Sequence, residues 1–204
     1  MKWLIFALAL VAAASAGAAT LGDVQRALAA TATMTADFAQ TAADGRVATG
    51  RMLLKRPGRI RFDYAGGTPY LVVADGRTLS FVDYKVAQVS QWPIRSTPLG
   101  VLLDPAADLA RVAEVLPDAE SPLPGAVAVR ARDPKRPDMG EILFLLGPDA
   151  AAPGGFRLLG WRVSDAQGRL TRVDLSNARF NVPVDDDRFR FADPRRRIIP
   201  GRPG

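Results

Sequence analysis

The sequence predicts an α+β protein in which one strongly curved antiparallel sheet is capped on its concave side by helices. Strand patterns dominate, because about ten short runs of alternating or continuously apolar residues are separated by turn residues. Helical spacing is confined to an N-terminal segment and a short mid-chain stretch, too little to cover a large sheet on both faces. The 204 residues contain no internal repeat and no dividing linker. Curving the sheet around the helices is therefore the economical way to bury its apolar face.

Composition limits the possible functions. Hydrophobic residues make up 48% of the chain, which suits a sizeable core, and there is neither His nor Cys. The Ser-His-Asp and Cys-His catalytic arrangements, and zinc sites built on these residues, are therefore impossible. A lipid hydrolase would need an activated nucleophile, but Ser80 and Ser90 have no His and no obvious Lys partner. We expect no enzyme, no cofactor and no metal.

The net charge of +6 is compatible with an anionic partner or with solubility alone. The arginines are spread through the predicted strands, and the aromatic residues lie opposite them in the alternation. A platform that stacks nucleic-acid bases needs both kinds of residue on one surface. We therefore predict no nucleic-acid partner.

The first 18 residues have the pattern of an export signal. Lys2 supplies the positive charge, the apolar run Leu4–Ala14 is too short to span a bilayer, and Ala16-Gly17-Ala18 fits a cleavage site. We predict cleavage after residue 18; an uncleaved anchor is the alternative. Since no Cys follows the apolar run, there is no site for lipid attachment, and we expect an exported, soluble protein without disulfides.

We expect a single domain over residues 19–194 and a flexible basic tail over residues 195–204. The first predicted element is a helix over Leu21–Phe38, whose apolar positions recur at helical spacing. Weak helix formers around Thr31–Thr33 leave open a division into two pieces, since Ala36–Thr41 alternates like the start of a strand. The apolar helical positions are Leu21, Val24, Leu28 and Thr31.

Between Gly50 and Asp83 the chain forms a predicted antiparallel meander with one apolar and one charged face. Turn signals at Pro57-Gly58 and Asp75-Gly76 separate its runs. The alternation assigns the residues of the first two runs to faces. One face carries Met52, Leu54 and Arg56, followed by Ile60, Phe62 and Tyr64. The third run, Leu71–Ala74, returns as Leu79-Ser80-Phe81.

The rest of the chain continues this pattern. A short strand is predicted over Val86–Val89, and Thr97-Pro98 begins a helix that carries Leu99, Leu102 and Leu103 on one side. A second short helix is predicted over Asp108–Leu116. The remaining predicted strands contain Val127 and Val129, Ile142–Leu146, Leu158–Val163, Leu170–Leu175, and finally Phe189 and Phe191.

From about residue 21 to 116 the chain resembles the periplasmic outer-membrane lipoprotein carrier family, the LolA type. The resemblance is carried by an ordered set of short motifs. These are Ala36-Asp37-Phe38-Ala39-Gln40, Gly50-x-Met-x-Leu-Lys55-Arg56-Pro57 running into Arg61-Phe62, Leu71-Val72-Val73-Ala74-Asp75-Gly76-x-Thr78-Leu79-x-Phe81, Val86-x-Gln88-Val89 and Thr97-Pro98.

The resemblance implies an unclosed antiparallel barrel, a half-barrel, with a helical lid over a hydrophobic cavity that takes the acyl chains of lipoproteins. It implies loading by an inner-membrane lipoprotein-releasing ABC transporter. It also implies unloading to an outer-membrane lipoprotein receptor, which has the same fold but is itself a lipoprotein. The missing Cys puts this chain on the soluble side of that pair. We expect a periplasmic monomer with acylated lipoproteins as cargo.

The resemblance also implies roles for individual residues. The arginine that holds the lid falls on Arg56, and the alternation and helical spacing add Tyr64, Leu99 and Leu102 to the apolar cavity. The sheet positions implied for the cavity are Met52, Leu54, Ile60, Phe62, Leu71, Val73, Leu79 and Phe81.

Other interpretations remain open at this point. Alternating apolar residues can simply fill a core. Arg56 among apolar residues needs acceptors, either lid carbonyls and loop oxygens or water beyond the end of its strand. The arginines of the charged face, Arg51, Arg59 and Arg61, form either a solvated surface or a docking surface for an acidic transporter or anionic head groups. The alternative function is a periplasmic lipid- or lipoprotein-sensing or glycolipid-binding module of the same fold.

Overall fold

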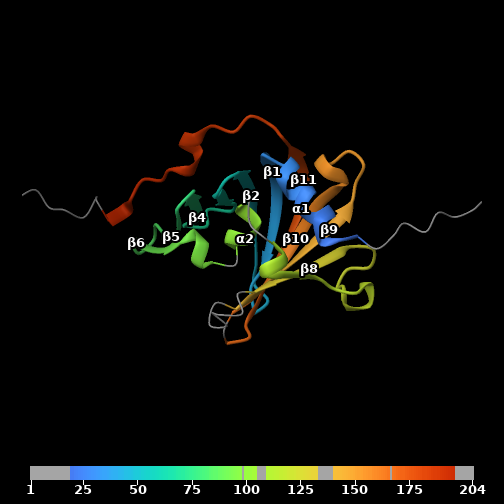
Figure 1. Cartoon of the computed structure of the whole chain (residues 1–204). Coiled ribbons are helices and arrows are strands. Elements are labelled where there is room, and N and C mark those ends of the chain that lie inside the picture. Colours follow the sequence, from blue (N-terminus) through green and yellow to red (C-terminus); the bar gives the residue numbers. More distant parts are fainter. Residues whose placement is uncertain (1–18, 98, 105–108, 133–139, 166, 196–204) are drawn as a thin grey trace, which may run out of the picture.

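The structure, a computed structural model, describes residues 19–97, 99–104, 109–132, 140–165 and 167–195 (Figure 1). Within these residues eleven strands form one antiparallel sheet, in the order β6-β5-β4-β3-β2-β1-β11-β10-β9-β8-β7. β6 and β7 are its edges, so the sheet does not close, as the sequence predicted. The strands are β1 (Thr33–Thr41), β2 (Val47–Lys55), β3 (Arg59–Tyr64), β4 (Tyr70–Asp75), β5 (Thr78–Asp83), β6 (Gln88–Pro93), β7 (Ala113–Val115), β8 (Val127–Arg132), β9 (Glu141–Pro148), β10 (Phe156–Ser164) and β11 (Leu170–Phe180).

Two meanders meet at the centre of the sheet. β1 to β6 run in chain order to one edge, and β7 to β11 run from the other edge back to β1. The segment from β6 to β7 therefore connects the two free edges. It contains α2 (Leu99–Leu103) and the 3₁₀ turns η1 (Ile94–Ser96) and η2 (Leu109–Arg111). In Figure 1, α2 lies between the two halves of the sheet.

α1 (Leu21–Ala30) begins with a capping box between Thr20 and Asp23. The Thr20 hydroxyl accepts from the Asp23 amide at 3.2 Å, and the Asp23 carboxylate accepts from the Thr20 amide at 2.7 Å. Of its two buried residues, Val24 packs in the main core and Ala27 lies against Gly154 of the turn η5 (Pro153–Gly155). The helix is therefore stabilised locally at its start and by packing along one side.

The predicted extension of this helix to Phe38 is wrong. The backbone is already extended at Thr31, and β1 starts at Thr33. β1 pairs with β2 on one side and with β11 on the other. Two rows of strand hydrogen bonds, together with β-branched residues at Thr31, Thr33 and Thr35, favour the strand over continued helix.

The short helix predicted over Asp108–Leu116 is also wrong. Its described part is the turn η2 followed by β7, which pairs with β8 at the sheet edge. The strand predicted over Val86–Val89 lies further along, over Gln88–Pro93, because Asp83 accepts backbone hydrogen bonds from Lys85 and Val86 and holds them in a turn.

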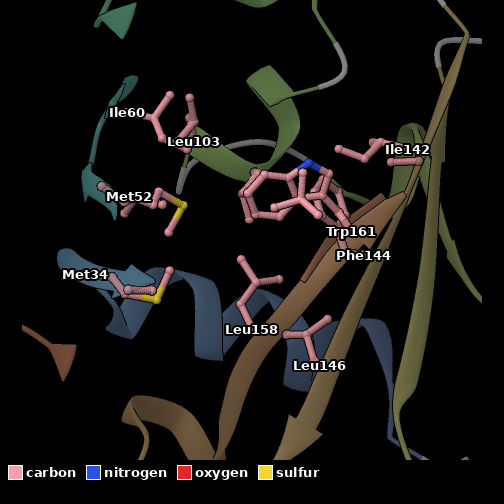
Figure 2. Close-up of a cluster of buried hydrophobic side chains, with 14 of the residues drawn as sticks. Met34, Met52, Ile60, Leu103, Ile142, Phe144, Leu146, Leu158 and Trp161 are labelled. Atoms are coloured by element: carbon pink, nitrogen blue, oxygen red, sulfur yellow. The ribbon is translucent and has the colours of Figure 1, made fainter. Parts of the chain in front are cut away.

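The main core fills the concave side of the sheet. Figure 2 shows side chains from β1, β2 and β3 pointing toward side chains from β9 and β10, with Leu103 of α2 between them. Met52, Leu54, Ile60 and Leu103 have no exposed surface. The two meanders are therefore held together by one apolar interior as well as by the β1–β11 pairing.

A second apolar cluster lies on the convex side and is covered by the C-terminal segment. Leu53, Leu71, Val73 and Val82 of the sheet pack there around Phe189. After β11 the chain turns back over the sheet toward β4 and β5 (Figure 1) and includes the turn η6 (Asp186–Phe189). The strand predicted around Phe189 and Phe191 is therefore wrong: this segment packs by its side chains and does not join the sheet.

Polar contacts tie this segment to β1, β2 and β3. Thr33 Oγ1 donates to the Val182 carbonyl at 2.5 Å, and Lys55 Nζ lies 2.7 Å from the Asp186 carboxylate. Arg61 Nη1 donates to the carbonyls of Arg188 and Arg190, each at 3.0 Å. Arg61 thus tethers the segment around Arg188 and Arg190 and is not a solvated surface residue.

The predicted signal peptide over residues 1–18 and all but the first residue of the predicted tail lie outside the described residues. Among the described residues, no helix combines the length and the apolar character needed to cross a membrane.

Replacing Phe189 tests the packing of the C-terminal segment. Phe189→Ala should lower the free energy of unfolding by about 3 kcal/mol, because a large buried side chain leaves a cavity over Leu53 and Val73. Urea denaturation of the two proteins measures the difference. Leu123→Ala, at a residue with 40% exposure, is the control and should change the value by less than about 0.5 kcal/mol. Equal effects of the two substitutions would contradict the packing role.

Candidate functional site

The concave face carries two cross-strand rows of apolar side chains. Met52, Phe62, Val72 and Phe81 occupy paired positions on β2, β3, β4 and β5. The second row lies beside the first, two residues away on each strand. It contains Leu54, Ile60, Ala74 and Leu79. Paired residues point to the same face. Six of the predicted cavity residues are therefore brought together on one surface: Met52, Leu54, Ile60, Phe62, Leu79 and Phe81.

Leu71 and Val73 are not part of this surface, and their assignment to it is a correction. They pair with Asp63 and Arg61, the charged face of β3, and belong to the convex cluster. β4 has apolar residues on both faces, because the C-terminal segment covers its outer side. Alternation cannot choose a face in a strand that is buried on both.

Burial along the concave rows falls toward the β6 edge. The β2 and β3 members are buried, whereas Leu79 and Phe81 on β5 are only partly buried. Beyond them, Trp92 is 47% exposed on β6, paired with Leu79, and Tyr70 is 41% exposed with its ring 5.5 Å from that of Phe81. The apolar surface therefore continues from the closed interior to an open aromatic margin.

Aromatic rings connect the two meanders at the centre of the site. Phe62 lies edge-on to Phe38 at 5.2 Å and to Trp161 at 5.9 Å. Tyr64 packs edge-on against Phe38, and its hydroxyl donates to Gln40 Oε1 at 2.8 Å. Burial raises the pKa of Tyr64 to about 12, so its phenol stays neutral and donates.

Sequence reasoning did not include Phe38 and Trp161 in the site. Phe38 falls within the predicted helix over Leu21–Phe38, although its alternation with Ala36 was visible. Trp161 belongs to the second meander, where only the sheet order brings it opposite Phe62.

α2 packs its leucines into the main core between the two halves of the sheet (Figure 1). Its Leu102 and Leu103 are 1% and 0% exposed within the main core, and Leu99 packs against that core while partly exposed. Gly100 lies against η1: an added Cβ would come within 2.6 Å of the Ile94 carbonyl oxygen. Beside this contact, Gly58, Ile94, Gly100 and Leu103 border a pocket of about 320 Å³. α2 is therefore seated by two leucines and a close backbone contact, with open space on one flank.

Arg56 joins α2 to the end of α1 through backbone carbonyls. Its Nε and Nη2 donate to the Leu102 carbonyl at 3.2 and 3.0 Å, and Nη1 donates to the Thr31 carbonyl. Burial lowers the pKa of Arg56 to about 10, so the guanidinium remains charged at neutral pH. The adjoining turn adds one more bond, from the Gly58 amide to the Leu103 carbonyl at 3.0 Å. The guanidinium therefore donates to backbone carbonyls of two different segments. That it acts as a latch for α2 stays a prediction.

The three arginines of the charged face lie in different surroundings. Arg61 bonds to Asp63 at 2.7 Å in addition to the C-terminal carbonyls, and Arg59 lies 3.5 Å from Asp186. The expected solvated surface is therefore wrong for Arg61. Arg51 is exposed and has no partner among the described residues.

A family model and individual relatives both match this chain to outer-membrane lipoprotein carrier proteins. A family model described as outer membrane lipoprotein carrier protein LolA matches residues 29–192. An outer-membrane lipoprotein carrier protein from Chromobacterium violaceum is 30% identical over 192 residues, covering 90% of this chain and 88% of that protein. One from Nitrosospira multiformis is 27% identical over 201 residues, covering 95% and 94%.

Among solved structures, a LolA superfamily protein from Nitrosomonas europaea superposes with a TM-score of 0.46 at 14% identity. The superposition covers 85% of this chain and 99% of that one.

Removing the Arg56 guanidinium should weaken the attachment of α2 to the rest of the protein. The Gly58 amide donates to the Leu103 carbonyl, so its hydrogen exchange reports whether α2 is seated. Hydrogen bonds from a charged donor contribute about 1.5–3 kcal/mol, so Arg56→Leu should speed exchange of this amide at least about tenfold. Arg51→Leu, at an exposed position on β2, the strand that Arg56 directly follows, is the control and should leave the rate unchanged. Unchanged exchange of Gly58 in Arg56→Leu would show that the guanidinium does not hold α2.

Proposed function

The chain belongs to the LolA family of outer-membrane lipoprotein carrier proteins, and from this premise we propose that it binds lipoprotein acyl chains on the concave face of its sheet. The observation that carries the proposal is the continuous apolar surface from the closed interior to the open aromatic margin. Met52 and Phe62 lie at its closed end, and Phe81 and Trp92 at its open end. An acyl chain that enters at the margin meets no charged side chain along these rows.

The hydrophobic effect is sufficient for binding. Each methylene removed from water contributes about 0.8 kcal/mol, so about a dozen contribute about 10 kcal/mol. Since Leu102 and Leu103 fill the interior, the acyl chain must replace them, and α2 must move outward. Such binding requires no polar recognition of the cargo, which suits a carrier that serves many lipoproteins.

Arg56 opposes the binding of an acyl chain. Its bonds to Leu102 and Thr31 stabilise the empty, closed form, and loading breaks the bonds to α2. Part of the acyl binding energy is therefore used to open the site, and closing favours release. A carrier without a nucleotide site can give up its cargo in this way.

The proposed cycle takes place in the periplasm between two membrane partners. The carrier, a monomer without its signal peptide, receives acylated lipoproteins from the inner-membrane lipoprotein-releasing ABC transporter. It then passes them to the outer-membrane lipoprotein receptor. The cycle has no chemical step.

A charge at the open margin should weaken acyl binding without disturbing the core. Phe81→Glu places a carboxylate on the concave row at a partly buried position, where an apolar ligand would desolvate it. We expect at least about tenfold weaker binding of a fluorescent fatty acid, measured by titration. Leu123→Glu, at an exposed loop residue, is the control. Equal affinity of a folded Phe81→Glu protein would remove β5 from the site.

Arg56→Leu should separate binding from release. The variant should bind a purified lipoprotein at least as tightly as the wild type, because opening no longer breaks hydrogen bonds. Transfer to a receptor should then be slower, because closing no longer drives release. Retention and transfer of the same labelled lipoprotein, compared with Arg51→Leu, measure both steps. Normal transfer by Arg56→Leu would contradict the latch, and binding without any transfer by the wild type would favour a lipid-sensing module.

A further inference from the structure

The end of the sheet away from α1 contains a second pocket that the carrier function does not use. It lies between the tips of the β1–β2 and β10–β11 hairpins. The two hairpin tips are at the bottom of Figure 1. Its volume is about 520 Å³. Three arginines line it, Arg162, Arg169 and Arg172, together with Thr41 and Leu170.

Carboxylates balance only two of the three arginines of this pocket among the described residues. Arg162 and Arg172 are directly paired across β10 and β11, an arrangement that like charges disfavour. Arg169 lies 2.7 Å from Asp165, and Arg172 lies 3.0 Å from Asp174. Arg162 has no hydrogen-bond or ion-pair partner within the described residues. The pocket therefore holds one unpaired cation beside two paired ones.

The position of the Arg162 guanidinium is set by the protein. Its Nε is buried without a hydrogen-bond partner, so the surrounding protein restricts the inner part of the group. No acceptor for its terminal nitrogens lies among the described residues, and the residue lines the pocket. A guanidinium that is fixed at its base and free at its end is suited to bidentate binding of a phosphate.

Exposed apolar residues flank the pocket and indicate where such a phosphate comes from. Val47 is 64% exposed and pairs with Thr41, and Leu170 is 45% exposed on the other hairpin. Thr41 in turn pairs with Arg172, so Val47 continues the row that contains the arginines. Apolar tips beside arginines match a bilayer surface, where apolar side chains enter the head-group boundary and arginines meet phosphates.

We propose that the pocket formed by Arg162, Arg169 and Arg172 binds the phosphate group of an anionic membrane phospholipid. Val47 and Leu170 enter the bilayer surface at the same time, so the hairpin tips rest on the membrane. This contact is independent of the concave face, because it involves the opposite end of β1, β10 and β11 and neither α2 nor Arg56.

Vesicle binding tests the proposal with the mature, exported protein. We expect it to co-sediment with vesicles that contain phosphatidylglycerol and much less with vesicles of phosphatidylcholine alone, and the difference should shrink with salt. Arg162→Gln should weaken binding to the anionic vesicles at least about fivefold. Arg51→Gln removes the same charge from an exposed position outside this pocket and should change binding less than about twofold.

Two further measurements separate the proposal from its alternatives. Replacing Val47 and Leu170 by Ser should weaken vesicle binding, whereas binding of soluble glycerol phosphate should stay as it is. Arg162→Gln should retain the fatty-acid affinity of the wild type, so a loss of vesicle binding is distinct from a failure of the carrier function. If Arg162→Gln does not fold, Arg172→Gln takes its place.

Three outcomes would overturn the proposal. Equal losses for Arg162→Gln and Arg51→Gln would mean that net charge alone attracts the protein to the vesicles. Binding of soluble phosphate without vesicle binding would assign the pocket to a free anion. No preference for anionic vesicles at low salt would exclude a membrane role for the pocket.

Discussion

A curved antiparallel sheet that does not close must cover its apolar inner face with something other than its own strands, and the rest of this structure follows from that constraint. Here the cover comes from α1 and from the connection between the two free edges, where α2 contributes Leu102 and Leu103. α2 has only five residues and cannot be stable alone. Its position therefore depends on packing and on the carbonyl bonds to Arg56 and Gly58.

The apolar residues of the convex face must be covered too. The C-terminal segment covers Leu53, Leu71 and Val73 with Phe189 and is tied down by Arg61 and Lys55. Its apolar and polar contacts extend from Asn181 to Arg190 and reach strands on both sides of β2. The two covers differ accordingly: one is long and tethered at many points, and the other is short and held by two buried leucines and by carbonyl bonds to Arg56 and Gly58. This difference is the physical basis for expecting the inner face to open while the outer face stays closed.

Three arginines of this chain differ in the groups that their guanidinium contacts. Arg56 is partly buried and satisfied by carbonyls, and Arg61 lies between a carboxylate and the carbonyls of the C-terminal segment. Arg162 is held in place without an acceptor at the tips of two hairpins. The overall positive charge of the chain does not distinguish these roles, because each depends on the elements that surround the side chain.

The sequence by itself determined the fold class, most of the strands and the apolar rows of β2 and β3, since Met52, Leu54, Ile60 and Phe62 alternate with charged residues. It also singled out Arg56, a cation among apolar residues. Only the tertiary structure decided the face of β4, whose apolar residues are buried on both sides, and the partnership of Phe62 with Trp161 from the other meander. The extent of α1 and the path of the C-terminal segment were decided there too, because strand pairing and burial against distant residues outweigh local preference. Local spacing carries information about neighbours along the chain, whereas sheet order and the covering of faces arise from contacts between residues far apart in it.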